Sequence, residues 1–186
     1  MHHLTRPQGR ITYDLYGAGN TGPLVVCVPG MFDHRHSFRF VGAGLAEAGY
    51  RVAVMDLRGH GDSDTTFDDH TSRAAATDVL ALAEELGGED VVIVGNSLGA
   101  GAAAIAAKDR PGTVSDAGGM RARAVVVMGE LDPDWKDPRA QAERVASVVG
   151  GSVLMVPECG HYAHAQRPDV VVPAVEALLQ EVVTGA

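Results

Sequence analysis

The sequence predicts an α/β fold with a mostly parallel sheet and helices on both of its faces. Short, continuously apolar runs such as 24–28 and 91–94 are typical of strands that are buried on both sides. Segments with helical patterns stand between these runs, as they do in successive βαβ units. The 186 residues, of which 46% are hydrophobic, suffice for one globular domain, and we expect a single domain over 1–186.

The N-terminal half is expected to alternate between strands and helices. Its strands either alternate in polarity, as an edge strand does, or are apolar throughout. Its helices end at glycines, Gly49 and Gly87, which are common helix terminators. In chain order these elements are an edge strand at 10–15, a strand at 24–28, a helix at 38–48, a strand at 51–56 and a helix at 71–86.

The C-terminal half continues the same alternation. Six of the nine residues 100–108 are alanine, the strongest helix former, and the stretch follows the apolar run 91–94 after five residues. The remaining runs are assigned by the same apolar and helical periodicities. In chain order the expected elements are a strand at 91–94, a helix at 100–108, a strand at 124–128, a helix at 139–149, a strand at 152–156 and a helix at 169–183.

The segment Gly95-Asn96-Ser97-Leu98-Gly99 carries the strongest chemical signal in the chain. It fits the pattern Gly-x-Ser-x-Gly and lies between a predicted strand and a predicted helix. A tight turn of this kind lifts the serine hydroxyl clear of the sheet, and the flanking glycines let neighbouring backbone approach closely. We therefore interpret Ser97 as a nucleophile.

A nucleophilic serine needs a base, and the base needs an acid that orients it. Asp132 follows the predicted strand at 124–128, and His161 follows the predicted strand at 152–156. Both therefore stand at the carboxyl edge of the sheet, where ligands bind in open α/β folds. We assign His161 as general base and acid, and Asp132 as the carboxylate that fixes the tautomer of its ring.

Each of these two assignments has competitors in the same loop. We favour Asp132 because it lies nearest to the strand end, and His161 because it leaves its strand first, after an expected sharp turn at Gly160. Other carboxylates of the first loop are more typical of turn or cap residues. The competitors are Asp134, Asp137 and His164.

An oxyanion hole is the third requirement for acyl transfer. One N–H group is expected from Leu98, the residue after the nucleophile. The second is expected from the loop after the strand at 24–28, where Met31 is the best candidate and Phe32 the second. Met31 and Phe32 are also suited to line an apolar substrate pocket.

Taken together, these pieces resemble the α/β-hydrolases of the single-domain esterase type. They occur in the order that the family has, and they cover most of the chain. Pro29 stands where many members have histidine. The matching segments are 28–31, 56–63, which resembles a structural turn of the family, 95–99, 129–132 and 160–161.

The resemblance breaks down between the alanine-rich helix and the loop of Asp132. The family usually has a further strand and a helical cap there, whereas this chain has only the short, glycine-rich stretch 109–122. We expect a loop in this place, with the cap and one core strand absent. Loops can absorb about one strand spacing of 4.8 Å, so a working triad is still expected.

The resemblance implies a serine hydrolase that cleaves short-chain carboxylic esters through an acyl-enzyme on Ser97. Lactone opening, perhydrolysis and carbon–carbon bond hydrolysis use the same Ser-His-Asp set in related proteins and remain open. A non-catalytic deletion form of the fold also remains open. A serine nucleophile argues against dehalogenase and epoxide hydrolase chemistry.

Composition limits the partners. The net charge of −9 argues against nucleic acid and anionic membranes as partners. No apolar run approaches ~18 residues and no signal peptide is recognisable, and we expect reduced Cys27 and Cys159 in a cytoplasmic protein. No cofactor or metal motif is found. Without a cap, Met31 and Phe32 stay exposed, which predicts some tendency to form a homodimer.

Overall fold

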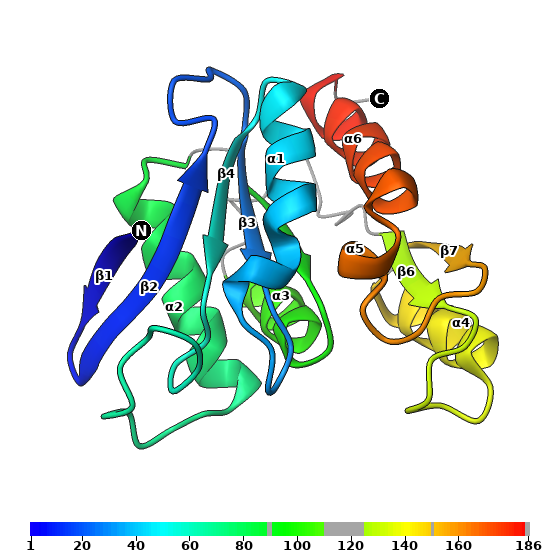
Figure 1. The fold of residues 1–186 in the computed structure, drawn as a ribbon, viewed down its shortest axis with the longest axis horizontal. Helices are drawn as coiled ribbons and strands as arrows, with labels where there is room; N and C mark the ends of the chain where they lie inside the picture. Colours follow the sequence, from blue (N-terminus) through cyan, green and yellow to red (C-terminus); the bar gives the residue numbers. More distant parts are fainter. Residues whose placement is uncertain (89–90, 110–124, 150, 185–186) are drawn as a thin grey trace. The chain divides into compact units, whose positions relative to one another are not determined.

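The computed structural model describes residues 1–88, 91–109, 125–149 and 151–184. The chain divides into two compact units, Met1–Asp116 and Ala117–Ala186, and each is described by itself. The ribbon in Figure 1 is coloured along the sequence, so that the first unit runs from blue to green and the second from yellow to red.

The first unit is built on a five-stranded sheet in the order β1-β2-β4-β3-β5. β2 is antiparallel to β1 and to β4, whereas β3 is parallel to both of its neighbours, β4 and β5. The parallel strands therefore send their carboxyl ends to one edge of the sheet. The strands are β1 His2–Arg6, β2 Gly9–Tyr16, β3 Leu24–Val28, β4 Arg51–Met55 and β5 Val91–Gly95.

Helices cover both faces of this sheet. In Figure 1 α1 lies in front of the strands and α2 and α3 lie behind them. Every residue of β3 is buried as a result, which explains its uninterrupted apolar sequence. The Thr71 side chain caps α2 by accepting a hydrogen bond from the Ala74 N–H at 3.3 Å. The helices are η1 Arg35–Phe38, α1 Arg39–Glu47, α2 Ser72–Glu85 and α3 Leu98–Asp109.

The turn after β4 has the structural role that the sequence predicts for 56–63. The buried Asp56 carboxylate accepts a hydrogen bond from the Asp62 N–H at 3.0 Å, and Ser63 Oγ accepts one from the Thr12 N–H at 2.9 Å. Gly61 has a φ of 52°, and a side chain there would collide with Asp56. The polar side chains thus tie this turn to the sheet.

The second unit contains a two-stranded parallel sheet of β6 and β7. α4 packs against both strands, and α5 and α6 contact β6 and each other. Asp137 caps α4, because its Oδ1 accepts a hydrogen bond from the Ala140 N–H at 3.0 Å. The elements are β6 Val125–Gly129, α4 Pro138–Val149, β7 Ser152–Val156, α5 Ala163–Gln166 and α6 Pro168–Thr184.

The predicted α/β class with helices on both faces is confirmed, and all the predicted strands and helices are present. β1, η1 and α5 were not predicted from the sequence. β1 holds only one buried apolar side chain, that of Leu4, so its sequence carries no strand pattern. His2 and His3 are exposed on this strand, and His3 Nδ1 lies 3.1 Å from Thr12 Oγ1.

One prediction falls outside the described residues. The loss of the cap and of one strand concerns 109–122, of which only Asp109 is described. The single domain over 1–186 stays a prediction. No helix in the described part of the chain is both long enough and apolar enough to cross a bilayer.

Candidate active site

Ser97 lies in the turn between the end of β5 and the first residue of α3. Its φ is 51°, in the left-handed region that a residue with a side chain rarely adopts. Within the described ranges only Phe32 and Glu158 share this property among the residues other than glycine. Strained backbone of this kind is concentrated at functional sites, and it fits the sharp turn that the sequence predicts for a nucleophile.

The two glycines of the motif allow this turn. A Cβ at Gly95 would lie 2.4 Å from the Gly99 carbonyl oxygen, and a Cβ at Gly99 would lie 2.2 Å from that of Val28. Both contacts are with backbone, which cannot move aside without displacing a strand or a helix. The predicted close approach of helix and strand is therefore found at both positions.

The loop after β3 runs beside the Ser97 turn. Val28 and Gly95 are register partners at the ends of β3 and β5, so the two loops leave the sheet side by side. A Cβ at Gly30 would lie 3.0 Å from the Cβ of Ser97. Met31 therefore directly follows a residue that packs against Ser97.

Two backbone N–H groups near Ser97 match the predicted oxyanion donors. Within the described residues, the N–H groups of Met31 and Leu98 have no acceptor in the protein. Leu98 begins α3, so its N–H also benefits from the positive end of the helix dipole. Both groups are thus available to a ligand oxygen.

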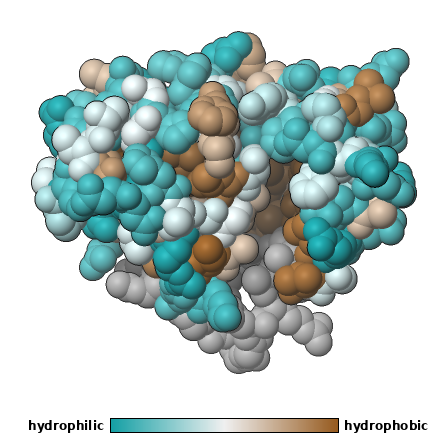
Figure 2. Space-filling view, turned by 90° about the horizontal axis from the view of Figure 1, so that it is seen from below, coloured by the Kyte–Doolittle hydropathy of each residue, from teal (hydrophilic) through white to brown (hydrophobic). Residues whose placement is uncertain are grey.

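Apolar side chains reach the surface at this loop. Met31 is 49% exposed and Phe32 is 90% exposed, and the Phe32 ring lies 6.4 Å from the ring of His60. Figure 2 views the molecule from the side at which β3 and β4 end, and hydrophobic surface is visible there. These side chains can contact the apolar part of a substrate, as predicted for Phe32.

In the second unit, the loops after β6 and β7 also run side by side. Gly129 and Val156 are register partners at the strand ends. The Leu131 N–H donates to the Cys159 carbonyl oxygen at 2.8 Å. A Cβ at Gly129 would lie 2.1 Å from the carbonyl oxygen of Gly160, so glycine is needed for this approach.

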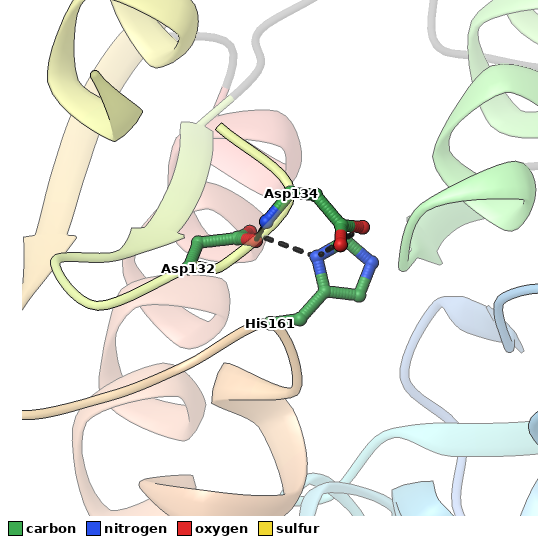
Figure 3. A group of neighbouring side chains, drawn as sticks. All are labelled: Asp132, Asp134 and His161. Carbon is green, nitrogen blue, oxygen red and sulfur yellow. Dashed lines mark hydrogen bonds and ion pairs between the residues drawn. The ribbon is translucent and has the colours of Figure 1, made fainter. Parts of the chain in front are cut away.

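This arrangement brings His161 and Asp132 together, as the sequence predicts. His161 Nδ1 lies 2.8 Å from Asp132 Oδ2, and the Asp132 side chain is only 2% exposed. Asp134 Oδ2 is 3.5 Å from the same nitrogen, and its side chain is 59% exposed (Figure 3). The shorter contact and the deeper burial favour Asp132 over Asp134 as the residue that orients the ring.

The two other competitors for the acid and base roles, Asp137 and His164, have different surroundings. Asp137 is the cap of α4, and His164 is buried in α5 with its ring 6.1 Å from that of Tyr162. A bend falls at His161, directly after the turn expected at Gly160, and the left-handed residue of this loop is Glu158, with a φ of 52°. Glu158 follows Pro157 in a tight turn directly after β7.

Gln166 is a residue of this site that the sequence did not indicate. Its Oε1 accepts hydrogen bonds from the Gly160 N–H at 2.7 Å and from Cys159 Sγ at 3.1 Å. It therefore holds the two residues before His161 in place. No sequence signal identifies it, because its role depends on α5 folding back onto the loop.

Two other groups of this loop, a thiol and a set of metal-ligating side chains, have chemistry of their own. Burial raises the pKa of the Cys159 thiol, which keeps it protonated and makes it a poor nucleophile. The ligand atoms of Asp132, Asp134 and His161 lie within 4.8 Å of one another, so these residues have the chemistry to hold a metal ion. A buried carboxylate bonded to an imidazole is also the pair that a serine nucleophile requires.

The predicted site residues thus fall into two groups. Ser97, Met31, Phe32 and Leu98 lie together in the first unit. Asp132 and His161 lie together in the second.

Comparison with known proteins points to one family. The family of the alpha/beta hydrolase fold matches residues 23–148, more than half of the chain. The matched range includes Ser97, both proposed oxyanion donors and Asp132.

Individual proteins are similar over parts of their length. The sn-1-specific diacylglycerol lipase ABHD11 of Mus musculus is 27% identical over 157 residues, which cover 77% of this chain and 51% of that protein. Epoxide hydrolase 3 of Siraitia grosvenorii is 32% identical over 102 residues, which cover 54% of this chain and 32% of that protein. The chain spans about half or less of the length of these curated relatives.

Solved structures share the fold. Est816, described as an N-acyl homoserine lactone degrading enzyme, matches with a TM-score of 0.82 over 95% of this chain and 99% of that chain. The sequence identity is 18%, so the likeness is one of fold.

Proposed function

Because the chain belongs to the α/β-hydrolase family, we propose that it is a serine hydrolase that cleaves carboxylic esters through an acyl-enzyme on Ser97. The observation that carries this proposal is the backbone of Ser97, which is held in a left-handed conformation between two glycines that accept no side chain. The unbonded N–H groups of Met31 and Leu98 beside it add an oxyanion hole.

In the proposed reaction, Ser97 Oγ attacks the ester carbonyl carbon while His161 accepts the hydroxyl proton. The carbonyl oxygen becomes an oxyanion and accepts hydrogen bonds from the N–H groups of Met31 and Leu98. The tetrahedral intermediate then expels the alcohol, which takes the proton from His161. Water attacks the acyl-enzyme in the same way and releases the acid, while Asp132 holds the ring by its Nδ1–H.

The relatives support the reaction class. ABHD11 of Mus musculus is a lipase by name, and lipases cleave ester bonds. Lactones are cyclic esters and form a second candidate substrate class, and Est816, which shares the fold, is described as an N-acyl homoserine lactone degrading enzyme. Lactone opening needs the same nucleophile and the same oxyanion donors, so one site serves both.

We further propose a preference for short acyl chains. Phe32 is 90% exposed and Met31 is 49% exposed, so an acyl chain lying on them keeps much of its surface in water. Each CH₂ group that stays unburied forgoes about 0.8 kcal/mol of binding free energy.

Cys27 and Cys159 form no disulfide, which supports a cytoplasmic location.

A fluorophosphonate probe tests the proposal, because it reacts only with an activated serine. We expect the probe to label the protein and peptide mass spectrometry to place the adduct on Ser97. Ser97→Ala and His161→Ala should each abolish labelling, and Ser147→Ala, which removes an exposed hydroxyl on α4, should leave it unchanged.

Two results would contradict the proposal. Undiminished labelling of Ser97→Ala would place the reactive group elsewhere. A folded wild-type protein that is not labelled, and that hydrolyses neither p-nitrophenyl acetate nor butyrate, would favour a non-catalytic form of the fold. Faster hydrolysis of p-nitrophenyl dodecanoate than of the butyrate would contradict only the short-chain preference and would leave the serine hydrolase proposal intact.

A further inference from the structure

Arg35 is an almost fully buried arginine surrounded by carboxylates. Its side chain is 5% exposed, and its Nη1 lies 2.6 Å from Asp56 Oδ2 and 2.7 Å from Asp62 Oδ2. Its Nε lies 2.8 Å from Asp14 Oδ2. One guanidinium therefore links β2, the end of β4 and the turn that follows β4.

The backbone of Arg35 is held by the same cluster. Its N–H donates to Asp56 Oδ1 at 2.7 Å, so one buried carboxylate binds both the main chain and the side chain of this residue. Asp56 is completely buried and lies directly after β4. Arg35 is thus fixed both in position and in orientation relative to the sheet.

This fixed point closes the loop that carries Met31. The loop starts at β3, where Gly30 packs against Ser97, and Arg35 follows Met31 by four positions. Between them, Asp33 stiffens the chain by accepting hydrogen bonds from the His34 N–H at 2.8 Å and from Ser37 Oγ at 2.7 Å. The position of the Met31 N–H is therefore determined from both ends of the loop.

Stability alone does not account for such a cluster. Removing charges from water carries a large penalty, and buried ion pairs often contribute little or nothing net to folding. Burial by itself would lower the pKa of Arg35, but hydrogen bonds to Asp62, Asp14 and Asp56 raise it above its ordinary value, so the residue stays charged. What the cluster supplies is directional hydrogen bonding from a planar guanidinium, which defines geometry.

We propose that Arg35 is a positioning residue for the oxyanion hole, which sets the place of the Met31 N–H relative to Ser97 through its carboxylate cluster. This inference rests on the proposed function. Loss of one oxyanion donor lowers turnover by about 10²- to 10³-fold, and a misplacement of about 1 Å can lower it by about 10²-fold. A donor that is displaced but not removed should stay at the low end of this range.

The test compares Arg35→Met with Arg6→Met. Arg6 is a partly buried arginine of the same unit that pairs with the buried Asp78 at 2.9 Å, on β1 and away from the Met31 loop. We expect Arg35→Met to lower kcat for p-nitrophenyl butyrate by about 10- to 100-fold, with KM changing less than about threefold. Arg6→Met should keep kcat within about twofold. Arg35→Lys should recover only part of the loss, because an ammonium lacks the planar fork.

A second readout does not depend on catalysis. Within residues 30–34, the hydrogen-bonded amides of Asp33 and His34 should exchange at least about tenfold faster in Arg35→Met and at an unchanged rate in Arg6→Met. If the wild-type protein is not labelled by fluorophosphonate, the proposed function fails, but the exchange measurement still decides the role of Arg35. Unchanged exchange in a folded Arg35→Met, or an equal loss of kcat in both variants, would overturn the inference.

A milder variant keeps the test decisive if Arg35→Met does not fold. Asp62→Asn removes the charge of the most exposed member, 58% exposed, and leaves the buried pair of Arg35 and Asp56 intact. We expect a loss in kcat of about two- to fivefold with an unchanged unfolding midpoint, and faster exchange at 30–34. No change in either kcat or exchange would again argue against a positioning role.

Discussion

The turn that carries Ser97 and the loop that carries His161 start from the same local design. Each leaves a pair of parallel strands at a register pair that contains a glycine, Val28 with Gly95 and Gly129 with Val156. In each, the missing side chain lets the backbone of an adjoining segment approach the strand end, so that the two segments touch directly.

The two regions differ in what holds them. β3 is buried along its whole length, and the loop that follows it is fixed by the charged cluster of Arg35. β6 and β7 are mostly of intermediate burial, and the His161 loop is held by uncharged hydrogen bonds from the backbone and from Gln166.

This difference fits the two tasks. Donors to a developing oxyanion must be in place before the charge appears, because their value comes from needing no reorganisation. An imidazole base needs only its tautomer and its ring orientation fixed, which one short bond from Nδ1 to the buried Asp132 provides. On the proposed function, the charged anchor thus lies beside the oxyanion donors and the uncharged anchor beside the base.

The largest expected effect comes from breaking that one bond. Asp132→Asn should lower kcat by about 10⁴-fold, because an amide can stabilise the wrong tautomer of His161. Asp134→Asn, at the longer distance of 3.5 Å and largely exposed, should change kcat less than about threefold. Steady-state kinetics on p-nitrophenyl butyrate would measure both, and a larger loss in Asp134→Asn would reverse the assignment.

A side chain should be equally destabilising at a glycine of either region, although different residues anchor the two loops. Gly99→Ala and Gly129→Ala each place a Cβ within 2.2 Å of backbone oxygen, and each should lower the free energy of unfolding by about 1–3 kcal/mol. Gly19→Ala is the matched control, since a Cβ there meets nothing within 4 Å. Urea unfolding would measure the effect. An unchanged free energy of unfolding in Gly129→Ala would mean that the His161 loop can shift to make room for the Cβ.

A smaller effect on kcat is expected when Gln166, the uncharged anchor of the His161 loop, is replaced. Gln166→Ala removes the acceptor of the Gly160 N–H and should lower kcat by about fivefold, since a hydrogen bond contributes about 1 kcal/mol. Gln166→Glu keeps an acceptor and should recover most of the activity. Gln141→Ala, which removes a contact within α4 only, should be neutral. A loss in Gln166→Ala as large as that in Arg35→Met would erase the contrast between the two anchors.

The smallest expected effect is on the free energy of unfolding at acid pH, through Asp14. Partial burial would raise the pKa of Asp14, but hydrogen bonds from the N-terminal amino group and Arg35 outweigh this and lower it below its ordinary value of 3.8. Its contribution to stability is therefore complete above about pH 4 and is lost as the pH falls through the lower pKa of the folded state. The free energy of unfolding should fall more gently below pH 4 in Asp14→Asn than in the wild type. Parallel curves would exclude a role for Asp14.

Local sequence was sufficient for much of this architecture. Apolar runs located the buried strands, and the motif at 95–99 located a strained serine, because both depend on neighbouring residues only. Chain order favoured Asp132 over Asp134, and the structure places Asp132 nearer to His161 Nδ1, at 2.8 Å against 3.5 Å, and deeper in the protein.

The anchors could not be predicted in this way. The cluster of Arg35 joins residues from β2, the end of β4 and the turn that follows it, and nothing in the sequence near any one of them indicates the others. Gln166 acts through the fold of α5. The left-handed residue of the His161 loop is Glu158, a residue type that does not indicate a positive φ, whereas Gly160 stands two positions later.

The left-handed backbone of Ser97 lowers the stability of the fold, whereas the proposed reaction needs the side chain at this position. A side chain in the left-handed region costs roughly 1 kcal/mol or more, and glycine at this position would avoid that penalty. Ser97→Gly should therefore be more stable than the wild type and chemically inert. Selection for thermostability alone would favour loss of this hydroxyl, so an effort to stabilise this protein by screening for folding would remove the proposed nucleophile unless activity were screened as well.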